Sequence, residues 1–121
     1  MTKPTNPTGL PYTPAVRVGD WVVVSGQIGL EDGSLVTGGF NAELKLCLTN
    51  LAARLGESGA TMADVVKTTV FLRHLNDYGH MNRLYAEVFP EPRPARSAVA
   101  VSDLPFGAMV EIEAWAYTGD R

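Results

Sequence analysis

Cysteine and histidine are scarce in this sequence, and their scarcity excludes two kinds of stabilising site. The only cysteine, Cys47, has no partner for an intrachain disulfide, which favours a reducing compartment. His74 and His80 are the only histidines, and together with Cys47 they do not make a ligand set at zinc-like spacing. We therefore expect no metal site, two surface histidines, and a buried, inert Cys47 thiol.

Clustered positive charge and long hydrophobic runs are also missing. The 10 Lys and Arg residues are outnumbered by 13 Asp and Glu residues, which gives a formal net charge of -3. Without a basic field for phosphates, nucleic acid is not an expected partner. No apolar run approaches the roughly 20 residues that span a bilayer, and residues 1–14 are polar and proline-rich, unlike a secretory signal. We expect a cytoplasmic protein, with no membrane segment, whose residues 1–14 form an irregular arm.

The length of 121 residues is that of one ordinary domain, 1–121. Near its start, two β-rich runs, Ala15–Val18 and Trp21–Gln27, flank Gly19-Asp20, and this pattern predicts a hairpin. Residues 29–39 are rich in glycine, so a loop that can adopt positive φ angles is expected there.

Two later segments have the hydrophobic periodicity of amphipathic helices. From Phe40 to Gly56, large apolar residues recur at steps of three and four positions. The second helix follows Asn76 or Asp77, either of which can cap it. Its apolar stripe consists of Tyr78, Met81, Leu84, Tyr85 and Val88. Between the two helices, Thr61 and Asp64 resemble the capping box of a short turn.

Three more segments are predicted strands. Val65–Leu72 is β-branched and almost continuously apolar, which is typical of a central strand covered on both faces. Ala95–Val101 follows a proline-rich connector, and Met109–Tyr117 alternates in polarity. In this last strand Val110, Ile112, Ala114 and Ala116 share one face, and Glu111, Glu113, Trp115 and Tyr117 share the other.

The resulting order, β-β-α-β-α-β-β, predicts an α+β fold with a mixed sheet and both helices on one face. The side of the last strand that contains Glu111 and Trp115 would then lie on the other face of the sheet. This side is too polar for a dry core and too aromatic for plain exposure to solvent. Such faces commonly meet another subunit in a closed cyclic assembly.

Arg96 is the strongest candidate for a functional residue, because it begins an apolar strand directly after a rigid proline segment. A partly buried guanidinium needs a partner, and its planar fork matches a carboxylate. The partner is either an internal acid in a structural salt bridge or the carboxylate of a ligand. Glu111 is one possible internal partner; alternatively it belongs to a charged outer face or intersubunit salt bridge, or it orients water as an acid or base.

Four further residues are weaker candidates. Ser25 and Gly26 end a valine-rich strand, where turn chemistry is the commoner explanation and ligand contact the alternative. No His-Asp partnership indicates that Ser25 is a nucleophile. Tyr12 either packs the arm down or presents its hydroxyl to a ligand. Asn82 lies on the second predicted helix, where a polar side chain is usually solvated.

Several blocks of sequence in the same order carry a resemblance over nearly the whole chain. They are Ser25-Gly26-Gln27, Val66–Phe71, Leu75–Tyr78 with Asn82, Pro94-Ala95-Arg96-Ser97, and Val110–Ala114 after Leu104-Pro105. These blocks resemble the YjgF/Rid family, also called the reactive intermediate deaminase or L-PSP endoribonuclease-like family.

The resemblance implies a chorismate-mutase-like homotrimer with active sites in the clefts between subunits. It also implies hydrolysis of small 2-imino acids, or their enamine tautomers, to 2-keto acids and ammonia, without a cofactor. By motif, Arg96 would bind the substrate carboxylate and Glu111 would position or activate water. Tyr12, Ser25, Gly26 and Asn82 would line the pocket.

The chain departs from the family pattern at Ala98, where deaminating members often have a cysteine. This change favours an altered substrate range. It also favours, as the rival hypothesis, a module of the same fold that binds a small keto acid without turnover. The endoribonuclease or translation-inhibitor role described for other members is less compatible with the acidic charge balance.

Overall fold

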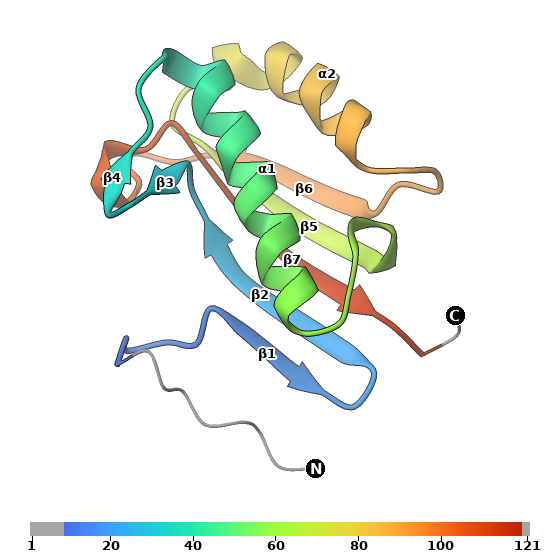
Figure 1. Cartoon of the computed structure of the whole chain (residues 1–121). Coiled ribbons are helices and arrows are strands. Elements are labelled where there is room, and N and C mark those ends of the chain that lie inside the picture. Colours follow the sequence, from blue (N-terminus) through green and yellow to red (C-terminus); the bar gives the residue numbers. More distant parts are fainter. Residues whose placement is uncertain (1–8, 120–121) are drawn as a thin grey trace.

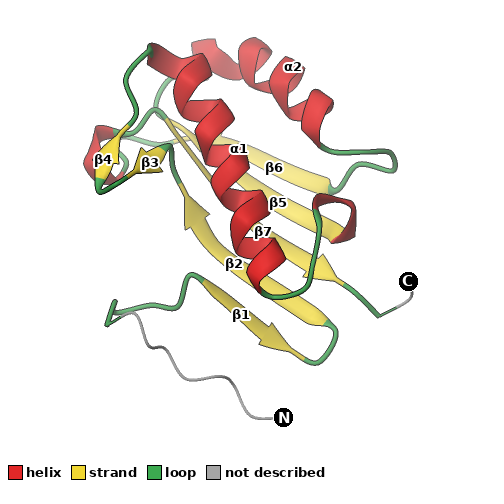
Figure 2. Ribbon diagram, viewed as in Figure 1, coloured by secondary structure: helices red, strands yellow, loops and turns green. Residues whose placement is uncertain are grey.

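The computed structural model describes residues 9–119 (Figures 1 and 2). Residues 9–14 contain no helix or strand, and the rest of the expected arm, residues 1–8, lies outside the described residues. The first two strands, β1 (Ala15–Val18) and β2 (Trp21–Gln27), form the predicted antiparallel hairpin.

Five strands form one mixed sheet in the order β1-β2-β7-β5-β6. The three later strands are β5 (Val65–Leu72), β6 (Ala95–Ala100) and β7 (Val110–Tyr117). Strands β5 and β6 pair in parallel, whereas the other neighbouring pairs are antiparallel. The predicted α+β class and mixed sheet are confirmed. The final strand of the chain lies inside the sheet, between β2 and β5.

Both helices cover the same face of this sheet, as predicted (Figures 1 and 2). Helix α1 (Gly39–Glu57) packs on β7 and β2, and α2 (Tyr78–Val88) packs beside α1. A short 3₁₀ turn, η1 (Met62–Asp64), precedes β5 and has the predicted capping box between Thr61 and Asp64. None of the described helices combines the length and apolar character needed to cross a membrane.

Alternation along β7 places the core under the helices. Its buried residues are Val110, Ile112, Ala114 and Ala116, and its half-buried or exposed residues are Glu111, Glu113, Trp115 and Tyr117. The predicted division of this strand into two faces is therefore confirmed. Because paired residues in a sheet point to the same side, β7 also determines which side chains of β2 and β5 point toward the helices.

The start of α2 differs from its prediction. Asp77 occupies the N-cap position, but its side chain makes no capping hydrogen bond. A capping residue usually has extended φ and ψ angles, whereas Asp77 has φ -83° and ψ 0° because it ends a 3₁₀ turn, η2 (Leu75–Asp77). This turn leads directly into the helix.

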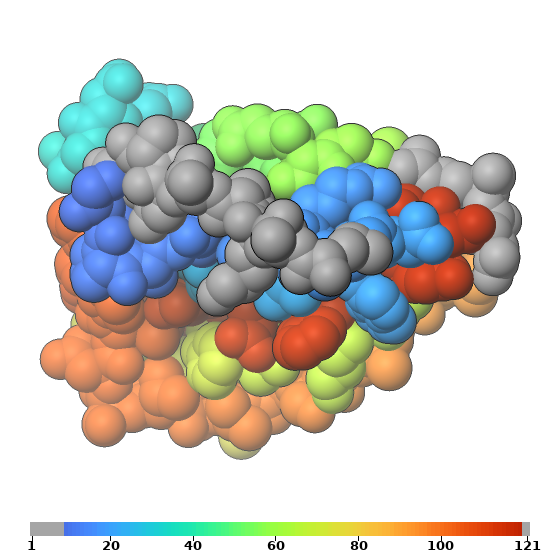
Figure 3. Space-filling view, turned by 90° about the horizontal axis from the view of Figure 1, so that it is seen from below, coloured from blue at the N-terminus to red at the C-terminus, as the bar shows by residue number. Residues whose placement is uncertain are grey.

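The glycine-rich segment 29–39, predicted to be a loop, contains a small hairpin. Its strands are β3 (Leu30–Glu31) and β4 (Ser34–Leu35). Asp32 and Gly33 connect them with φ angles of 52° and 81°, the left-handed geometry of a tight hairpin turn. Each strand is too short to produce a detectable period in the sequence. In Figure 3 this segment (cyan) projects at one end of the molecule.

The prediction that β5 is covered on both faces is wrong for the single chain. Val70 and Leu72 are buried under the helices, whereas Val66 is 42% exposed and Thr69 is only half-buried. The strand lies inside the sheet, but no described helix covers its second face. Its β-branched composition therefore reflects an interior position in the sheet without two covering layers.

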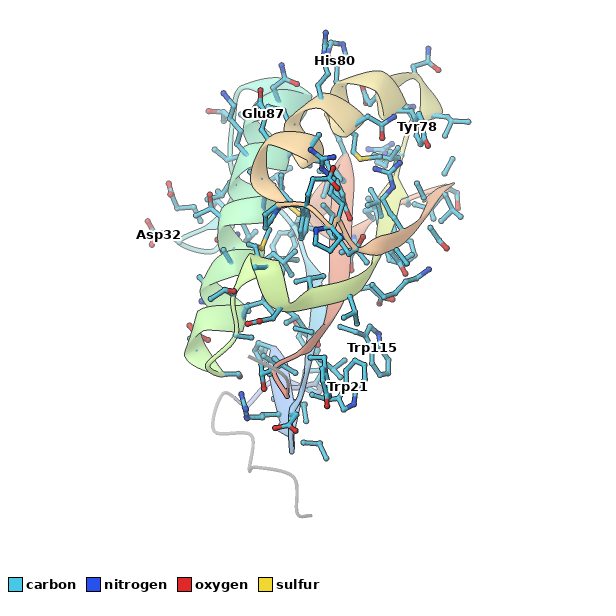
Figure 4. All side chains as sticks on the ribbon, turned by 90° about the vertical axis from the view of Figure 1, so that its right-hand side faces the viewer. Trp21, Asp32, Tyr78, His80, Glu87 and Trp115 are labelled. Carbon is cyan, nitrogen blue, oxygen red and sulfur yellow. The ribbon has the colours of Figure 1, made fainter. Side chains whose placement is uncertain are left out.

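Aromatic side chains gather on the face that the helices leave uncovered. Trp21 and Trp115 make an edge-to-face contact with ring centroids 6.4 Å apart, and Trp21 also packs on Tyr117 at 5.0 Å. The two tryptophans remain 42% and 47% exposed. In Figure 4 they lie at the opposite end of the molecule from Tyr78. An exposed aromatic group of this size is typical of a surface that meets another protein.

A buried hydrogen bond joins the sheet to α2, because Thr68 Oγ1 and Tyr85 Oη are 2.6 Å apart. Thr68→Val removes one partner at nearly constant volume and leaves the buried Tyr85 hydroxyl unpaired. We expect the free energy of unfolding, measured by urea titration, to fall by about 1–3 kcal/mol. Adding Tyr85→Phe should recover part of this loss, since no polar atom then remains buried without a partner.

The matched control is Thr69→Val on the half-buried face of the same strand. It should change the free energy of unfolding by less than about 0.5 kcal/mol. Equal losses from both threonine variants would show that strand composition, and not the Thr68–Tyr85 bond, determines the result.

Candidate functional site

A cavity of about 460 Å³ lies where the N-terminal segment meets the end of β2 and the turn before β7. Its lining residues are Leu10, Tyr12, Pro14, Ser25, Gly26, Gln27, Ile28, Leu30, Asn50, Arg54, Pro105, Phe106 and Glu111. Four candidates from the sequence, Tyr12, Ser25, Gly26 and Glu111, are thus brought together. Cavities of this size, mainly apolar with a few convergent polar groups, are the usual form of small-molecule sites.

Ser25 fastens the N-terminal segment to the wall of this cavity. Its hydroxyl donates a hydrogen bond to the carbonyl of Thr13 at 2.7 Å, and its backbone N–H donates to the carbonyl of Pro14 at 2.9 Å. These bonds hold Tyr12 at the rim, where its side chain is 54% exposed. Because the Ser25 proton is already donated, its oxygen is left to act as an acceptor.

Gly26 makes room for the Glu111 carboxylate. A Cβ atom on Gly26 would overlap the carboxylate group of Glu111. The ladder between β2 and β7 shifts its register between Val24 and Gln27, which is the stretch that contains Gly26. The Glu111 carboxylate therefore packs directly against the backbone of β2 at an interruption in the strand pairing.

Glu111 is the titratable carboxyl group of the cavity. Burial raises its pKa above the ordinary value, and the negative charge of the neighbouring Glu113 raises it further. Within residues 9–119 it takes part in no ion pair. A carboxyl group with a raised pKa holds a proton more readily than a solvated one. This property suits a group that exchanges protons with water.

Arg96 lies outside this cavity, between the sheet and α2. Its guanidinium donates to the hydroxyl of Tyr78 at 3.1 Å and to the sulfur of Met81 at 3.4 Å. Its Cζ atom lies 5.5 Å from the centre of the Tyr78 ring and 5.0 Å from that of Tyr85, which are cation–π distances. Among the described residues, Arg96 forms no ion pair with a carboxylate.

The possible pairing of Arg96 with Glu111 does not occur. Arg96 is opposite Thr68 of β5, and Thr68 is opposite Ala114 of β7, so the Arg96 side chain shares the helix-covered face. Glu111 is opposite Phe71 and belongs to the other face. Since β5 separates β6 from β7, the two candidate catalytic residues lie on strands that are not neighbours and on opposite faces of the sheet.

Asn82 belongs to the half of the site that contains Arg96. It is half-buried on α2, one turn after Tyr78, so the two side chains share a helix face. The six candidates thus form two groups. The first group lines the cavity and consists of Tyr12, Ser25, Gly26 and Glu111. The second consists of Arg96 on β6 and Asn82 on α2.

Sequence reasoning missed several residues of both groups. Tyr78 and Tyr85 were assigned only to a hydrophobic stripe, although their rings contact Arg96. Phe106 lines the cavity with a φ angle of 62° and is 64% exposed, and an aromatic residue inside a Leu-Pro-Phe-Gly turn was a usable signal. Asn50 and Arg54 lie on an ordinary helix, where no local signal marks them. Among the described residues, no group of three His, Cys, Asp or Glu side chains is placed to hold a metal ion.

Comparison with known sequences connects this arrangement to one family. The family model described as Endoribonuclease L-PSP matches residues 4–118. A RutC family protein of Pyrococcus abyssi is 46% identical over 109 residues, which cover 88% of this chain and 86% of that protein. A Mus musculus protein named 2-iminobutanoate/2-iminopropanoate deaminase is 45% identical over 111 residues, which cover 90% of this chain and 82% of that protein.

Solved structures of this family have the same fold. RidA from the Antarctic bacterium Psychrobacter sp. matches with a TM-score of 0.86 at 37% identity, covering 97% of this chain and 98% of that chain. The YjgF gene product of E. coli matches with a TM-score of 0.84 at 34% identity, covering 94% and 93%. These matches confirm the arrangement of two helices on one face of a mixed sheet.

The raised pKa of Glu111 predicts a pH-dependent gain of stability in Glu111→Gln. Below the unfolded pKa of about 4.3, both states are protonated and the group has no effect. As pH rises above this value, the unfolded chain loses the proton while the folded wild type still holds it, so the wild type loses stability until the folded group ionises too. The variant should therefore gain stability relative to wild type as pH rises from about 4, and the gain should level off above the folded pKa at less than about 1 kcal/mol, because the group is solvent-screened.

Urea titrations across this pH range measure the difference, and a carbon NMR titration of the Glu111 carboxyl group measures its pKa directly. Glu113→Gln removes the neighbouring charge and should lower the pKa of Glu111 without removing the group. A Glu111 pKa at or below the ordinary range in wild type would contradict the burial argument.

Proposed function

Because the chain belongs to the YjgF/Rid family, we propose that it is a hydrolytic deaminase that converts small 2-imino acids and their enamine tautomers into 2-keto acids and ammonia. Relatives that are named 2-iminobutanoate/2-iminopropanoate deaminase support this reaction class. The observation on which the proposal depends is the state of Arg96, a cation held between aromatic rings with no carboxylate partner among the described residues.

Arg96 is suited to bind the carboxylate of a substrate. Its contacts with Tyr78 and Met81 use only part of the donors of the guanidinium fork. The flanking rings hold the plane of the group, so little conformational entropy remains to be lost when a ligand binds. A carboxylate that accepts two parallel N–H···O bonds would have its adjacent C=N carbon presented in one orientation.

The proposed assembly is a homotrimer in which the Arg96 half of one copy meets the cavity half of the next. The separation of Arg96 from Glu111 within one chain supports this arrangement, because a single copy would leave either half incomplete. The uncovered sheet face supports it too, since the exposed indoles of Trp21 and Trp115 would gain burial in an assembly.

In the proposed reaction, Glu111 takes a proton from water as the water oxygen bonds to the imine carbon. The electron pair of the C=N bond moves to nitrogen, which receives the proton and gives a carbinolamine. A second transfer, from the new hydroxyl to nitrogen, forms the C=O bond, breaks the C–N bond and releases ammonia. One water is consumed, and Glu111 is regenerated. An enamine first takes a proton at its β-carbon and loses one from its nitrogen, which gives the imine.

The remaining candidates would shape the pocket. Tyr12 and Ser25 would contact the substrate from the cavity side, and Gly26 would keep the Glu111 carboxylate in place. Asn82 would act from the side of α2. These groups need to supply only a modest rate enhancement, because an imine is electrophilic and hydrolyses unaided. Orientation of water and substrate would supply most of that enhancement.

A second candidate is a module that binds a small keto acid without turnover. The observation that favours it is Ala98, which replaces the cysteine that deaminating members often have. Ala98 is half-buried and packs against the core on the same face as Arg96. Substrate binding through Arg96 would survive this replacement, whereas a reaction that needed the thiol would not.

Arg96→Ala tests both candidates. With 2-iminopropanoate generated in situ by an amino-acid oxidase, we expect kcat/KM to fall at least about 100-fold, because two charge-assisted hydrogen bonds are lost. The readout is keto acid formation above the spontaneous rate. Arg83→Ala removes an exposed arginine from α2 whose side chain bonds, within residues 9–119, to His80 alone, and it should retain wild-type activity.

Two outcomes would contradict the deaminase itself, and a third, turnover without Arg96, would contradict only the role given to Arg96. Thermal stabilisation by keto acids without any turnover would establish the binding module. Turnover that survives Arg96→Ala would show that another group binds the carboxylate. Cleavage of RNA that is unaffected by Arg96→Ala, without hydrolysis of imines, would point to the nuclease activity in the description of the family model.

The assembly has its own test. Light scattering coupled to size-exclusion chromatography should give three times the chain mass of 13.0 kDa. Trp115→Glu places a charge within the exposed aromatic group and should shift the population toward single chains. A wild-type protein that elutes as a single chain and still hydrolyses imines would refute a site shared between copies.

A further inference from the structure

The cavity contains a cation that none of the preceding arguments uses. Among the described residues that line it, only Arg54, in the last turn of α1, has a positively charged side chain. Its side chain is 31% exposed, and Nη2 donates to Oε2 of Glu57 at 2.7 Å. Glu57 is 61% exposed, so this pair lies at the surface and contributes little to stability.

The Nε atom of Arg54 is in a different situation. It is shielded from solvent and has no hydrogen-bond acceptor among the described residues. A buried donor without a partner is costly, and such groups in folded proteins call for an explanation. Of the described arginines, Arg73 also has an unpaired buried Nε, but it lies outside the cavity and has a carboxylate oxygen of Asp103 4.0 Å away.

Arg54 belongs to a part of α1 that side-chain hydrogen bonds hold against the β2–β3 connection. One turn earlier on α1, the side-chain amide of Asn50 donates to the carbonyls of Ile28 and Leu30 at 2.9 and 3.0 Å. Both amide hydrogens are used, so Asn50 holds the β2–β3 connection against the helix. The guanidinium of Arg54 is therefore presented from a rigid surface.

The cavity is larger than a small substrate requires, and Arg54 lines the additional space. At about 460 Å³ it falls within the range of sites that enclose drug-sized molecules. A substrate with only three or four carbons would leave much of it empty. Leu30 and Ile28, next to the Asn50 contacts, provide an apolar wall suited to a carbon chain. A cation on such a wall fits an acidic group at the far end of that chain.

We propose that Arg54 binds a second carboxylate of the substrate, and that this chain acts preferentially on imines or enamines of dicarboxylic amino acids. This inference rests on the proposed function for the reaction and on Arg54 for the substrate class. The distal carboxylate accepts from an accessible N–H group of the Arg54 guanidinium, in competition with the exposed Glu57. Arg96 retains the carboxylate next to the reacting carbon.

The test compares Arg54→Met, which removes the charge at similar length, with Arg54→Lys, which keeps it. Imines are generated in situ from glutamate and from alanine, and binding of 2-oxoglutarate and pyruvate is measured by calorimetry. For Arg54→Met we expect KM for the dicarboxylic imine, and Kd for 2-oxoglutarate, to rise about tenfold or more. The monocarboxylic ligands should change by less than about twofold, and Arg54→Lys should retain part of the discrimination.

Two controls isolate the role of Arg54. Glu57→Gln breaks the surface ion pair but keeps the cation, so affinity for 2-oxoglutarate should stay the same or increase. Arg73→Met removes the other arginine with an unpaired Nε and should leave both ligand classes unchanged. Circular dichroism and melting curves verify that each variant is folded.

The outcomes separate this inference from the proposed reaction. If neither imine is turned over but 2-oxoglutarate binds in an Arg54-dependent way, the reaction is refuted and the second binding group stands. If both imines are turned over and Arg54→Met affects them equally, or affects neither, the dicarboxylate inference is overturned. Absence of any preference for 2-oxoglutarate over pyruvate in the wild type overturns it as well.

Discussion

One-sided burial of β7 determines which faces of the sheet Glu111 and Arg96 occupy. Residues Val110 to Ala116 alternate strictly, and the apolar half of the alternation is sealed under α1. Glu111 must therefore point away from the helices, and the close packing of Gly26 then fixes its carboxylate against β2. The same alternation, transmitted through β5, turns Arg96 toward α2. A shift of β7 by one residue would bury Glu111 and expose Ile112, so the register is strongly specified.

This constraint explains why an acid and a base of opposite charge do not neutralise each other within the chain. A salt bridge between Arg96 and Glu111 would lower the pKa of the carboxyl group and use the donors of the guanidinium. Their separation leaves Glu111 with a raised pKa, and leaves Arg96 between two aromatic rings with no carboxylate partner among the described residues. Both groups are thus held in reactive states, each stabilised locally, which is the condition a site completed by a second copy would require.

Local sequence patterns predicted the local parts of this structure. The hairpin at Gly19-Asp20, the capping box at Thr61, both helices and the two faces of β7 follow from periods and turn residues that lie close together in the chain. The order of the strands does not, because pairing joins segments far apart in sequence, and β5 separates two strands that are consecutive along the chain. For the same reason the sequence identified Arg96 and Glu111 as candidates but not their separation. Arg54 was undetectable, since an arginine on an amphipathic helix is ordinarily a solvated residue.

The position of Ala98 bears on where substrate selectivity resides. Ala98 packs against the core beside Val70, on the helix-covered face, and is not a lining residue of the cavity. In the proposed site, a change at this position would therefore act on the carboxylate held by Arg96 and not on the far end of a bound chain. The far end is formed by the wall of α1, the β2–β3 connection and the turn at Phe106. In the proposed site, Arg54 would therefore act on the far end of a substrate from α1, without contacting Arg96 or Ala98 on the helix-covered face of the sheet.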